Sequence, residues 1–387
     1  METMKPIRYQ HACAVMFLIA GAAHAQSSVT LYGVVTDGLN FTSNGGGHTS
    51  FRMQSGDVPN SRWGLLGSED LGGGYKAVFR LENGFDVNTG ALQQGGREFG
   101  RQAYVGLASD RYGTLTLGRQ YDPTVDLFSG FTGAGSWAGV AAGHPFDNDN
   151  TDWDFRVNNA IKYVSQNWHG LTVEGMYAFS DQAGGFADNR LYSAAVQYQN
   201  GGLRAAAAYL KINNGGLATG AVTSDTVFTG SSEQNIDAGV SYRFEKAQVS
   251  LAYSHVDMYD PTAGVWLPAA GVQPRGGKWN AWKFNNIEVN GQYFLPHGFS
   301  VGAAYTFTAA RLASTVGEYS PKWHQLALML NYDLSKRTAV YLQGAYQHVV
   351  SAHTGTDFDF AQIPLIGAGL SSSVNQGVIR VAMVHRF

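Results

Sequence analysis

The sequence predicts an all-β fold: a 16-stranded antiparallel transmembrane β-barrel with an inward-folded third long loop. Three observations carry this prediction. Glycine is abundant (49 residues) and proline scarce (10), which suits strands and turns better than helices. Charged residues make up only 14% of the chain, against about 25% in soluble domains, so part of the surface faces something other than water. Segments that alternate apolar and polar residues recur along the whole chain.

Residues 1–25 have the pattern of a cleaved signal peptide, which leaves residues 26–387 for the barrel. Lys5 and Arg8 give a positive start, an apolar stretch follows, and Ala23-His24-Ala25 forms a cleavage site of small residues. The only cysteine, Cys13, lies in the signal, so the mature chain has no disulfide or thiol chemistry. Without the signal the chain carries 24 basic and 28 acidic residues. This small negative balance predicts no nucleic-acid partner.

The lengths of the connections between strands distinguish a membrane β-barrel from a soluble β-protein. No run of 18 apolar residues follows the signal, which excludes a transmembrane helix. Seven short and eight long connections alternate strictly, which gives 16 strands, and this alternation is typical of outer-membrane barrels. The short connections lie near 68–74, 109–112, 166–170, 199–202, 244–246, 295–298 and 333–337. The long ones lie near 42–60, 87–99, 121–155, 180–190, 211–235, 258–285, 310–322 and 350–375.

The positions of the aromatic residues and the form of the last strand support a closed β-barrel in a membrane. One row of aromatics lies beside the short turns and another toward the long loops, as interfacial girdles require. The chain ends on a strand whose last residue is Phe387. An unpaired strand edge in lipid would leave backbone polar groups without partners, so we expect this strand to pair with the first strand, Val29 to Phe41.

The connection at 121–155 is too long to be an ordinary turn and too aromatic to be a solvated linker. We therefore expect it to pack against other parts of the chain. It contains no Lys or Arg, whereas Arg119, Arg156 and Lys162 lie on the flanking strands. An acidic loop that faces a basic wall is the resulting hypothesis. The candidate loop acids are Asp122, Asp126, Asp147, Asp149 and Asp152.

Several motifs in order resemble the general porins of Gram-negative outer membranes, which are trimeric sixteen-stranded barrels. They are S-V-T-L-Y-G (28–33), S-R-W-G-L-L-G-S-E-D-L-G-G-G (61–74), F-G-R-Q-A-Y-V-G-L (99–107), L-G-R-Q-Y-D (117–122), R-V-N-N-A-I-K-Y (156–163) and the terminal R-F. The resemblance implies that the third long loop folds inward and faces a ladder of basic residues, here Arg62, Arg101 and Arg156. The loop tip departs from many relatives, since it reads His144-Pro145-Phe146-Asp147.

Strand parity supports part of this basic wall independently. Arg62, Arg80, Arg156 and Lys162 alternate with apolar neighbours and should face the lumen, because a charge that faces lipid would cost roughly 2–4 kcal/mol. Arg101 has an ambiguous parity. These five residues are the predicted basic wall of a pore constriction.

Two further groups of residues are assigned to assembly. Arg119 shares the outward parity of Leu115 and Leu117, so it needs a partner outside the lumen, and we expect a subunit contact there with Glu98 nearby. The family implies a homotrimer in contact with outer-membrane lipid and lipopolysaccharide. Phe387 and its strand have the form of a signal for the outer-membrane assembly machinery.

No motif predicts catalysis, a cofactor or a metal. The phosphate-binding, zinc-protease and nucleophile-elbow patterns are missing. The run 147–152 is similar to a calcium loop, but it has Asp152 where that loop needs Gly and Asn158 where it needs Glu. The histidines, His144 among them, are scattered over separate connections and strands, which predicts solvated side chains.

The expected function is passive diffusion of small hydrophilic solutes and ions across the cell outer membrane of a Gram-negative bacterium, with weak charge selectivity. A 16-stranded barrel is wide enough for an aqueous lumen. A channel selective for a sugar or an anion is the alternative, and a sugar channel would need an aromatic track that Trp137 and Trp153 could begin. An outer-membrane hydrolase is disfavoured because its catalytic cluster and its smaller strand number are missing.

Overall fold

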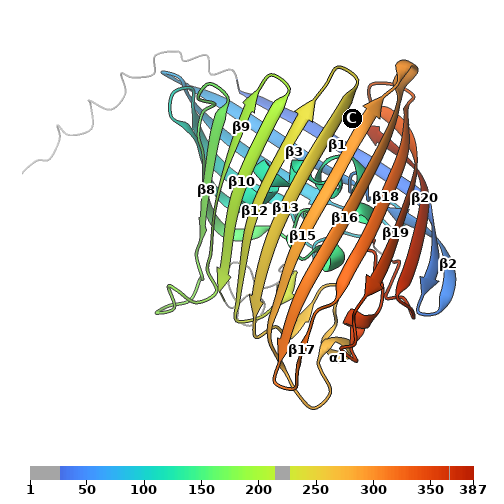
Figure 1. The fold of residues 1–387 in the computed structure, drawn as a ribbon. Helices are drawn as coiled ribbons and strands as arrows, with labels where there is room; N and C mark the ends of the chain where they lie inside the picture. Colours follow the sequence, from blue (N-terminus) through green and yellow to red (C-terminus); the bar gives the residue numbers. More distant parts are fainter. Residues whose placement is uncertain (1–26, 214–226, 366) are drawn as a thin grey trace, which may run out of the picture.

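A computed structural model describes residues 27–213, 227–365 and 367–387. The predicted signal peptide and part of the predicted loop at 211–235 lie outside these ranges. Strands of the described residues join into one antiparallel sheet that closes on itself as a barrel (Figure 1). Its wall consists of β1 (Ser28–Gly45), β3 (Arg62–Gly72), β4 (Tyr75–Gly84), β5 (Gln102–Ser109), β6 (Gly113–Gln120), β7 (Val157–Val164), β8 (Leu171–Ala178), β9 (Leu191–Asn200), β10 (Leu203–Asn213), β12 (Ser232–Arg243), β13 (Ala247–Tyr259), β15 (Trp279–Phe294), β16 (Phe299–Ser314), β18 (Lys322–Asp333), β19 (Thr338–Val350) and β20 (Asn375–Arg386). These are the 16 strands that the sequence predicts.

Short extra strands extend the wall. β2 (His48–Ser55) and β3 lie one after the other along the same edge of β1. The prediction of one long loop at 42–60 is therefore wrong, because most of this segment belongs to the sheet. A tight turn at Gly46 and Gly47 leads into β2, and only residues 56–61 leave the sheet. β17 (Glu318–Tyr319) pairs with the end of β16. β11 (Phe228–Thr229) and β14 (Ala263–Gly264) form a separate ladder.

The barrel closes between its first and last strands, as predicted. β1 and β20 pair from Val34 opposite Arg386 to Thr42 opposite Val378. Two backbone hydrogen bonds between Gly33 and Phe387, of 3.1 and 3.0 Å, extend the ladder to the last residue. Among the residues that the structure describes, this closure leaves no unpaired strand edge in the hydrocarbon region, where unsatisfied backbone groups are costly.

The two faces of each strand differ as the alternation predicts. On β15, Ile287 and Val289 are about half exposed on the outer face, whereas Glu288 and Asn290 between them are buried. The outer face is the apolar belt of a membrane barrel. The inner side chains are polar, and here they are buried because another part of the chain covers them.

Short and long connections lie at opposite ends of the barrel. The tight turns, with the one at η6 (Pro296–Gly298), gather at the end that carries the C-terminus, and the longer connections gather at the other end (Figure 1). Most of their positions agree with the predicted ones to within a few residues, but β15 begins at Trp279, well before the predicted end of the connection at 258–285, and β3 runs into the predicted turn at 68–74. Among the described residues no helix is long and apolar enough to cross a membrane.

Residues 121–156, here called loop 3, fold into the barrel between β6 and β7. Its helical turns are seen within the barrel in Figure 1, and contacts with β15, β16, β18 and β19 place it against the wall far from its own strands. The helical turns of loop 3 are η1 (Thr124–Phe128), η2 (Ser129–Phe131), η3 (Ala134–Ala138), η4 (Val140–Ala142) and η5 (Pro145–Asp147).

Aromatic packing fixes the tip of loop 3. Phe146 is fully buried, with its ring centroid 5.5 Å from that of Trp323 and 5.4 Å from that of Phe358. Phe358 belongs to η7 (Asp357–Asp359), and α1 (Ala269–Val272) lies beside it. The external loops thus fold over the barrel mouth and hold the tip of loop 3.

Candidate functional site

Three arginines from the barrel wall surround one buried carboxylate. Glu82 on β4 is 1% exposed and accepts from Arg101 at 2.9 Å and from Arg80 at 2.6 Å, with Arg62 at 3.9 Å. Arg80 also donates to the Tyr32 hydroxyl at 2.7 Å. Hydrogen bonds between charged groups are among the strong ones. Glu82 therefore holds three guanidinium groups close together and offsets the repulsion between their like charges.

The ambiguous parity of Arg101 is resolved by its position. It precedes β5 and its backbone N–H donates to the carbonyl of Glu82 at 3.1 Å. Its side chain is fully buried in the cluster with Arg62 and Arg80. The structure thus brings Arg62, Arg80 and Arg101 together around Glu82, and their role as the wall of a pore constriction stays a prediction.

Tyr121 connects this cluster to loop 3. Its hydroxyl accepts from Arg101 at 2.7 Å and from Arg156 at 2.7 Å. The Arg156 guanidinium also lies over the Tyr121 ring, 4.9 Å from its centroid. Arg156 is only 3% exposed, so it braces the start of loop 3 more than it presents charge to the lumen.

Lys162 on β7 is held between two acids. Its Nζ contacts Asp126 of loop 3 and lies 3.0 Å from Glu174. It also donates to the Tyr121 carbonyl at 3.0 Å. Asp126 keeps 34% of its side chain exposed. In this pair a predicted loop acid forms a direct ion pair with the predicted basic wall.

The cluster opens onto a cavity of about 270 Å³. Arg62 and Arg80 are partly exposed there, with 21% and 29% of their side chains accessible. Three arginines face two carboxylates in this lining, so its formal charge is positive. The lining residues are Arg62, Arg80, Glu82, Arg101, Gln102, Tyr121, Val125, Asp126 and Trp153.

Of the other predicted constriction acids, Asp152 is 5% exposed and lines a second cavity together with Arg62. Asp122, Asp147 and Asp149 are fully buried within loop 3, so these three do not form the acidic face that the sequence predicts opposite the arginines. Asp122 accepts from the Thr124 N–H at 2.9 Å within the loop. Burial, and then the neighbouring Asp126 charge, raise the pKa of Asp122 to about 6. Asp122 and Asp149 find partners in the loop itself and on the opposite wall, whereas both oxygens of Asp152 and one oxygen of Asp147 have none.

His144 is a second correction, because it is fully buried and not solvated. Its Nδ1 donates to Asp149 at 2.6 Å and its Nε2 to Glu288 of β15 at 3.1 Å. Burial lowers the pKa of His144, but the charge and hydrogen bond of Asp149 and the bond to Glu288 outweigh this and raise it to about 10. Burial raises the pKa of Asp149, but the His144 charge and its hydrogen bond outweigh it and lower this pKa. An imidazolium between two carboxylates thus ties loop 3 to the far wall.

Glu288 and Asn290 complete this attachment. The N–H of Gly133 donates to Glu288 at 2.7 Å, and Asn290 donates to the carbonyl of Phe131 at 2.8 Å. Trp137 donates to Asn290 at 3.3 Å. Because Trp137 is buried in this contact, it cannot begin an aromatic track along the lumen.

The two predicted subunit-contact residues differ in environment. Arg119 is 8% exposed and donates to the carbonyl of Gly100 at 2.8 Å and to Asn158 at 2.6 Å. The premise that it needs a partner on another subunit is therefore wrong, because its own chain supplies partners. Glu98 is exposed. Their contact across a subunit interface stays a prediction.

Three important residues were not singled out from the sequence. Glu82 lies on the same inward parity as Arg80, so strand alternation could have found it. Glu288 likewise alternates with Ile287 and Val289. Tyr121 has no such signal, since it lies at the first residue of loop 3 and its role depends on Arg101 and Arg156 from two different places in the chain.

Comparisons with known proteins agree with this architecture. The profile of the Gram-negative porin family matches residues 12–351. An outer membrane porin protein of Bordetella pertussis is 32% identical over 377 residues, which cover 87% of this chain and 92% of that protein. Outer membrane porin protein 32 of Delftia acidovorans is 30% identical over 383 residues, which cover 95% and 96%.

Solved structures show the same fold. The anion-selective porin from Comamonas acidovorans superposes with a TM-score of 0.71 at 24% identity and covers 94% of this chain and 100% of its own. The trimer form of OmpT from Vibrio cholerae superposes with a TM-score of 0.65 at 15% identity and covers 93% and 99%. With the closed barrel and its inward loop, these matches show that the chain belongs to the Gram-negative porin family of outer-membrane channels.

Proposed function

We propose that this porin is a diffusion channel for small hydrophilic solutes, with a weak preference for anions. The observation that carries the proposal is the cavity beside loop 3, where Arg62 and Arg80 are exposed while Glu82 is buried beneath them. Asp126 is the acid that shares this space, and it is paired with Lys162. A small solute that passes here meets more positive than negative formal charge. The relative from Comamonas acidovorans is itself described as anion-selective.

Loop 3 sets the size limit in this proposal. Its attachment at both walls, through Tyr121 on one side and His144 on the other, leaves the space beside the arginines as the passage. Swelling of liposomes that contain the purified protein tests this part. Neutral sugars should enter at rates that fall steeply with mass. Entry of none of them would contradict the proposal, as would saturable entry of a single sugar.

A homotrimer is the proposed assembly. The trimer form of the Vibrio cholerae protein supports it, as does the apolar outer face of the barrel. Outer-membrane lipid and lipopolysaccharide would cover the remainder of that face. Conductance steps in a planar bilayer should appear in groups of three. Single steps together with a monomeric mass in mild detergent would exclude the trimer.

A further inference from the structure

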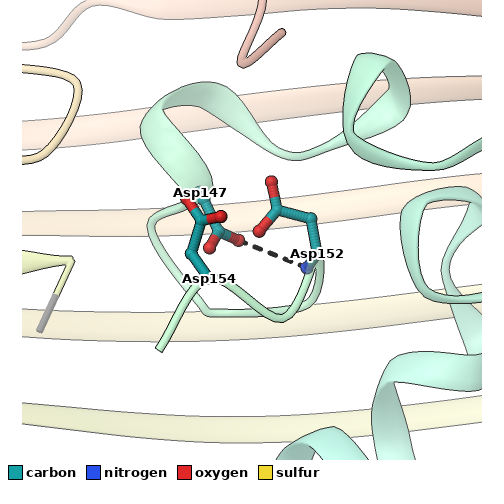
Figure 2. Close-up of side chains that lie close together, drawn as sticks. All are labelled: Asp147, Asp152 and Asp154. Atoms are coloured by element: carbon teal, nitrogen blue, oxygen red, sulfur yellow. Dashed lines mark hydrogen bonds between the residues drawn. The ribbon is translucent and has the colours of Figure 1, made fainter. Parts of the chain in front are cut away.

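Three carboxylates of loop 3 converge at its tip. Asp147, Asp152 and Asp154 each offer an oxygen, and these oxygens lie within 4.8 Å of one another. Figure 2 shows the three side chains gathered in one bend of the loop, with the backbone N–H of Asp152 donating to Asp147 at 3.4 Å. The calcium-loop pattern missed this group, because the spacing of the three acids does not follow that motif.

The carboxylates of this group lack the partners that buried acids normally have. Asp152 is 5% exposed, and neither of its oxygens accepts a hydrogen bond. One oxygen of Asp147, which is fully buried, is also unpartnered. Buried charges are normally paired or coordinate a metal. Asp147 and Asp152 therefore carry three buried oxygens without a hydrogen-bond partner, close to the carboxylate of Asp154.

Two basic groups of loop 3, His144 and Arg156, have partners other than these carboxylates. His144 is held by Asp149 and Glu288. Arg156 donates to the backbone carbonyl of Asp154 at 2.8 Å and to Tyr121. Asp154 accepts at 3.1 Å from the indole of Trp266, which carries no charge.

We propose that Asp147, Asp152 and Asp154 bind one calcium ion at the tip of loop 3. Ca²⁺ takes oxygen ligands at about 2.3–2.6 Å, so two oxygens on one ion lie at most roughly 5 Å apart, which the group satisfies. Zinc prefers nitrogen and sulfur ligands, and Mg²⁺ usually binds through one or two carboxylates. Water and backbone carbonyls would complete the coordination of the larger ion.

The site has a route of entry. Asp152 lines a cavity of about 240 Å³ between loop 3 and residues 57–60. Asp57 and Arg62 line the same cavity. In this proposal the cavity is the route by which a cation reaches Asp152. Bound there, it would cross-link the two ends of the bend and hold the loop that narrows the pore.

Terbium luminescence tests the proposal on the folded full-length mature protein in detergent. Tb³⁺ replaces Ca²⁺ at oxygen sites and emits when a nearby indole is excited, and Trp266 contacts Asp154 directly. After chelation and removal of metals, Tb³⁺ should give sensitised emission that saturates at one ion per chain. Added Ca²⁺ should abolish this emission.

Two neutral variants and a matched control make the test specific. Asp152→Asn and Asp154→Asn should each weaken Tb³⁺ binding at least tenfold. Asp126→Asn removes an acid of the same loop outside the group and should bind as the wild type does. Equal affinity in all four proteins would overturn the proposal. The proposal would also be overturned if the wild-type protein gave no Ca²⁺-sensitive Tb³⁺ emission at neutral pH. That result would mean that a proton shared by Asp147 and Asp152, and not a metal ion, neutralises the group. Asp154 is partly exposed, so its variant remains informative if Asp152→Asn fails to fold.

Discussion

Single residues on loop 3 divide into those that face the lumen and those that hold the loop in place. Asp126 is partly exposed at the arginine-lined cavity. Asp122, four residues earlier, is fully buried. A unit charge about 8 Å from a passing ion, at an effective dielectric constant near 40, contributes on the order of 1 kcal/mol. Only the exposed acid can contribute this to permeation.

We therefore expect different anion-to-cation permeability ratios from two similar substitutions. Asp126→Asn should raise the anion-to-cation permeability ratio several-fold, because it leaves Lys162 with less neutralising charge. Asp122→Asn should leave the ratio unchanged. Reversal potentials of the two variants under one salt gradient make the comparison. If Asp122→Asn shifts the ratio as much as Asp126→Asn does, burial is not the property that separates them.

His144 predicts a dependence of stability on alkaline pH. Its pKa is raised in the folded protein to about 10 from about 6.5 in an unfolded chain. The stabilisation is therefore fully present below pH 6.5 and is lost as the pH rises through 10. The melting temperature of the wild type should exceed that of His144→Gln at pH 7. The difference should shrink above pH 10, and a difference that stays constant from pH 7 to 11 would contradict the assignment.

At the scale of elements, glycines on the inner face of the strands make room for loop 3. A Cβ at Gly302 of β16 would lie 2.6 Å from the ring of Trp137, and one at Gly239 of β12 would lie 2.7 Å from Phe131. Both aromatics are buried. The strands and the loop are therefore fitted to each other, although they are far apart in the chain.

Gly302→Val should displace Trp137 and loosen the loop. Overpacking of this kind costs about 1–3 kcal/mol, so we expect a lower melting temperature and noisier single-channel currents. Gly175→Val on β8 is the control, because no atom lies within 4 Å of a Cβ built there. If both substitutions lower the melting temperature equally, the loss of stability comes from placing Val in a strand and not from displacing Trp137.

The sequence predicts the elements well because their pattern is local. Alternation in β15 is visible within one strand, and turn lengths are visible within one connection. Hydrogen bonds and ion pairs between segments far apart in the sequence leave no such local pattern. His144 between Asp149 and Glu288, and Glu82 beneath Arg62, depend on where loop 3 and the wall meet in space. The predicted loop at 42–60 failed for a related reason, since a two-glycine turn allowed β2 to continue the sheet.

At the scale of the whole molecule, closure of the barrel depends on its last residue. Phe387 forms two backbone hydrogen bonds with Gly33. Its ring covers Gly33, where a Cβ would come within 2.3 Å of the ring. The role of Phe387 as a signal for the assembly machinery is a separate prediction.

Deletion of Phe387 should reduce the amount of folded protein in the outer membrane. The reason is that the deletion removes both closing hydrogen bonds and an interfacial aromatic. The heat-modifiable band on gels of membrane fractions measures the effect. Phe387→Tyr keeps both properties and should assemble normally. Unchanged folding of the deletion variant would show that the rest of the β1–β20 ladder suffices.

The central claim is that exposed arginines beside loop 3 give this channel a weak preference for anions, and a reversal potential tests it most directly. In a planar bilayer with a tenfold KCl gradient, the wild type should show a potential of the sign that marks chloride as the more permeant ion. This preference should fade above about 0.15 M salt, where the screening length is about 8 Å. Replacing both Arg62 and Arg80 with Gln should abolish or reverse the preference. A wild-type potential of the cation-selective sign, or one that the double substitution leaves unchanged, would contradict the account.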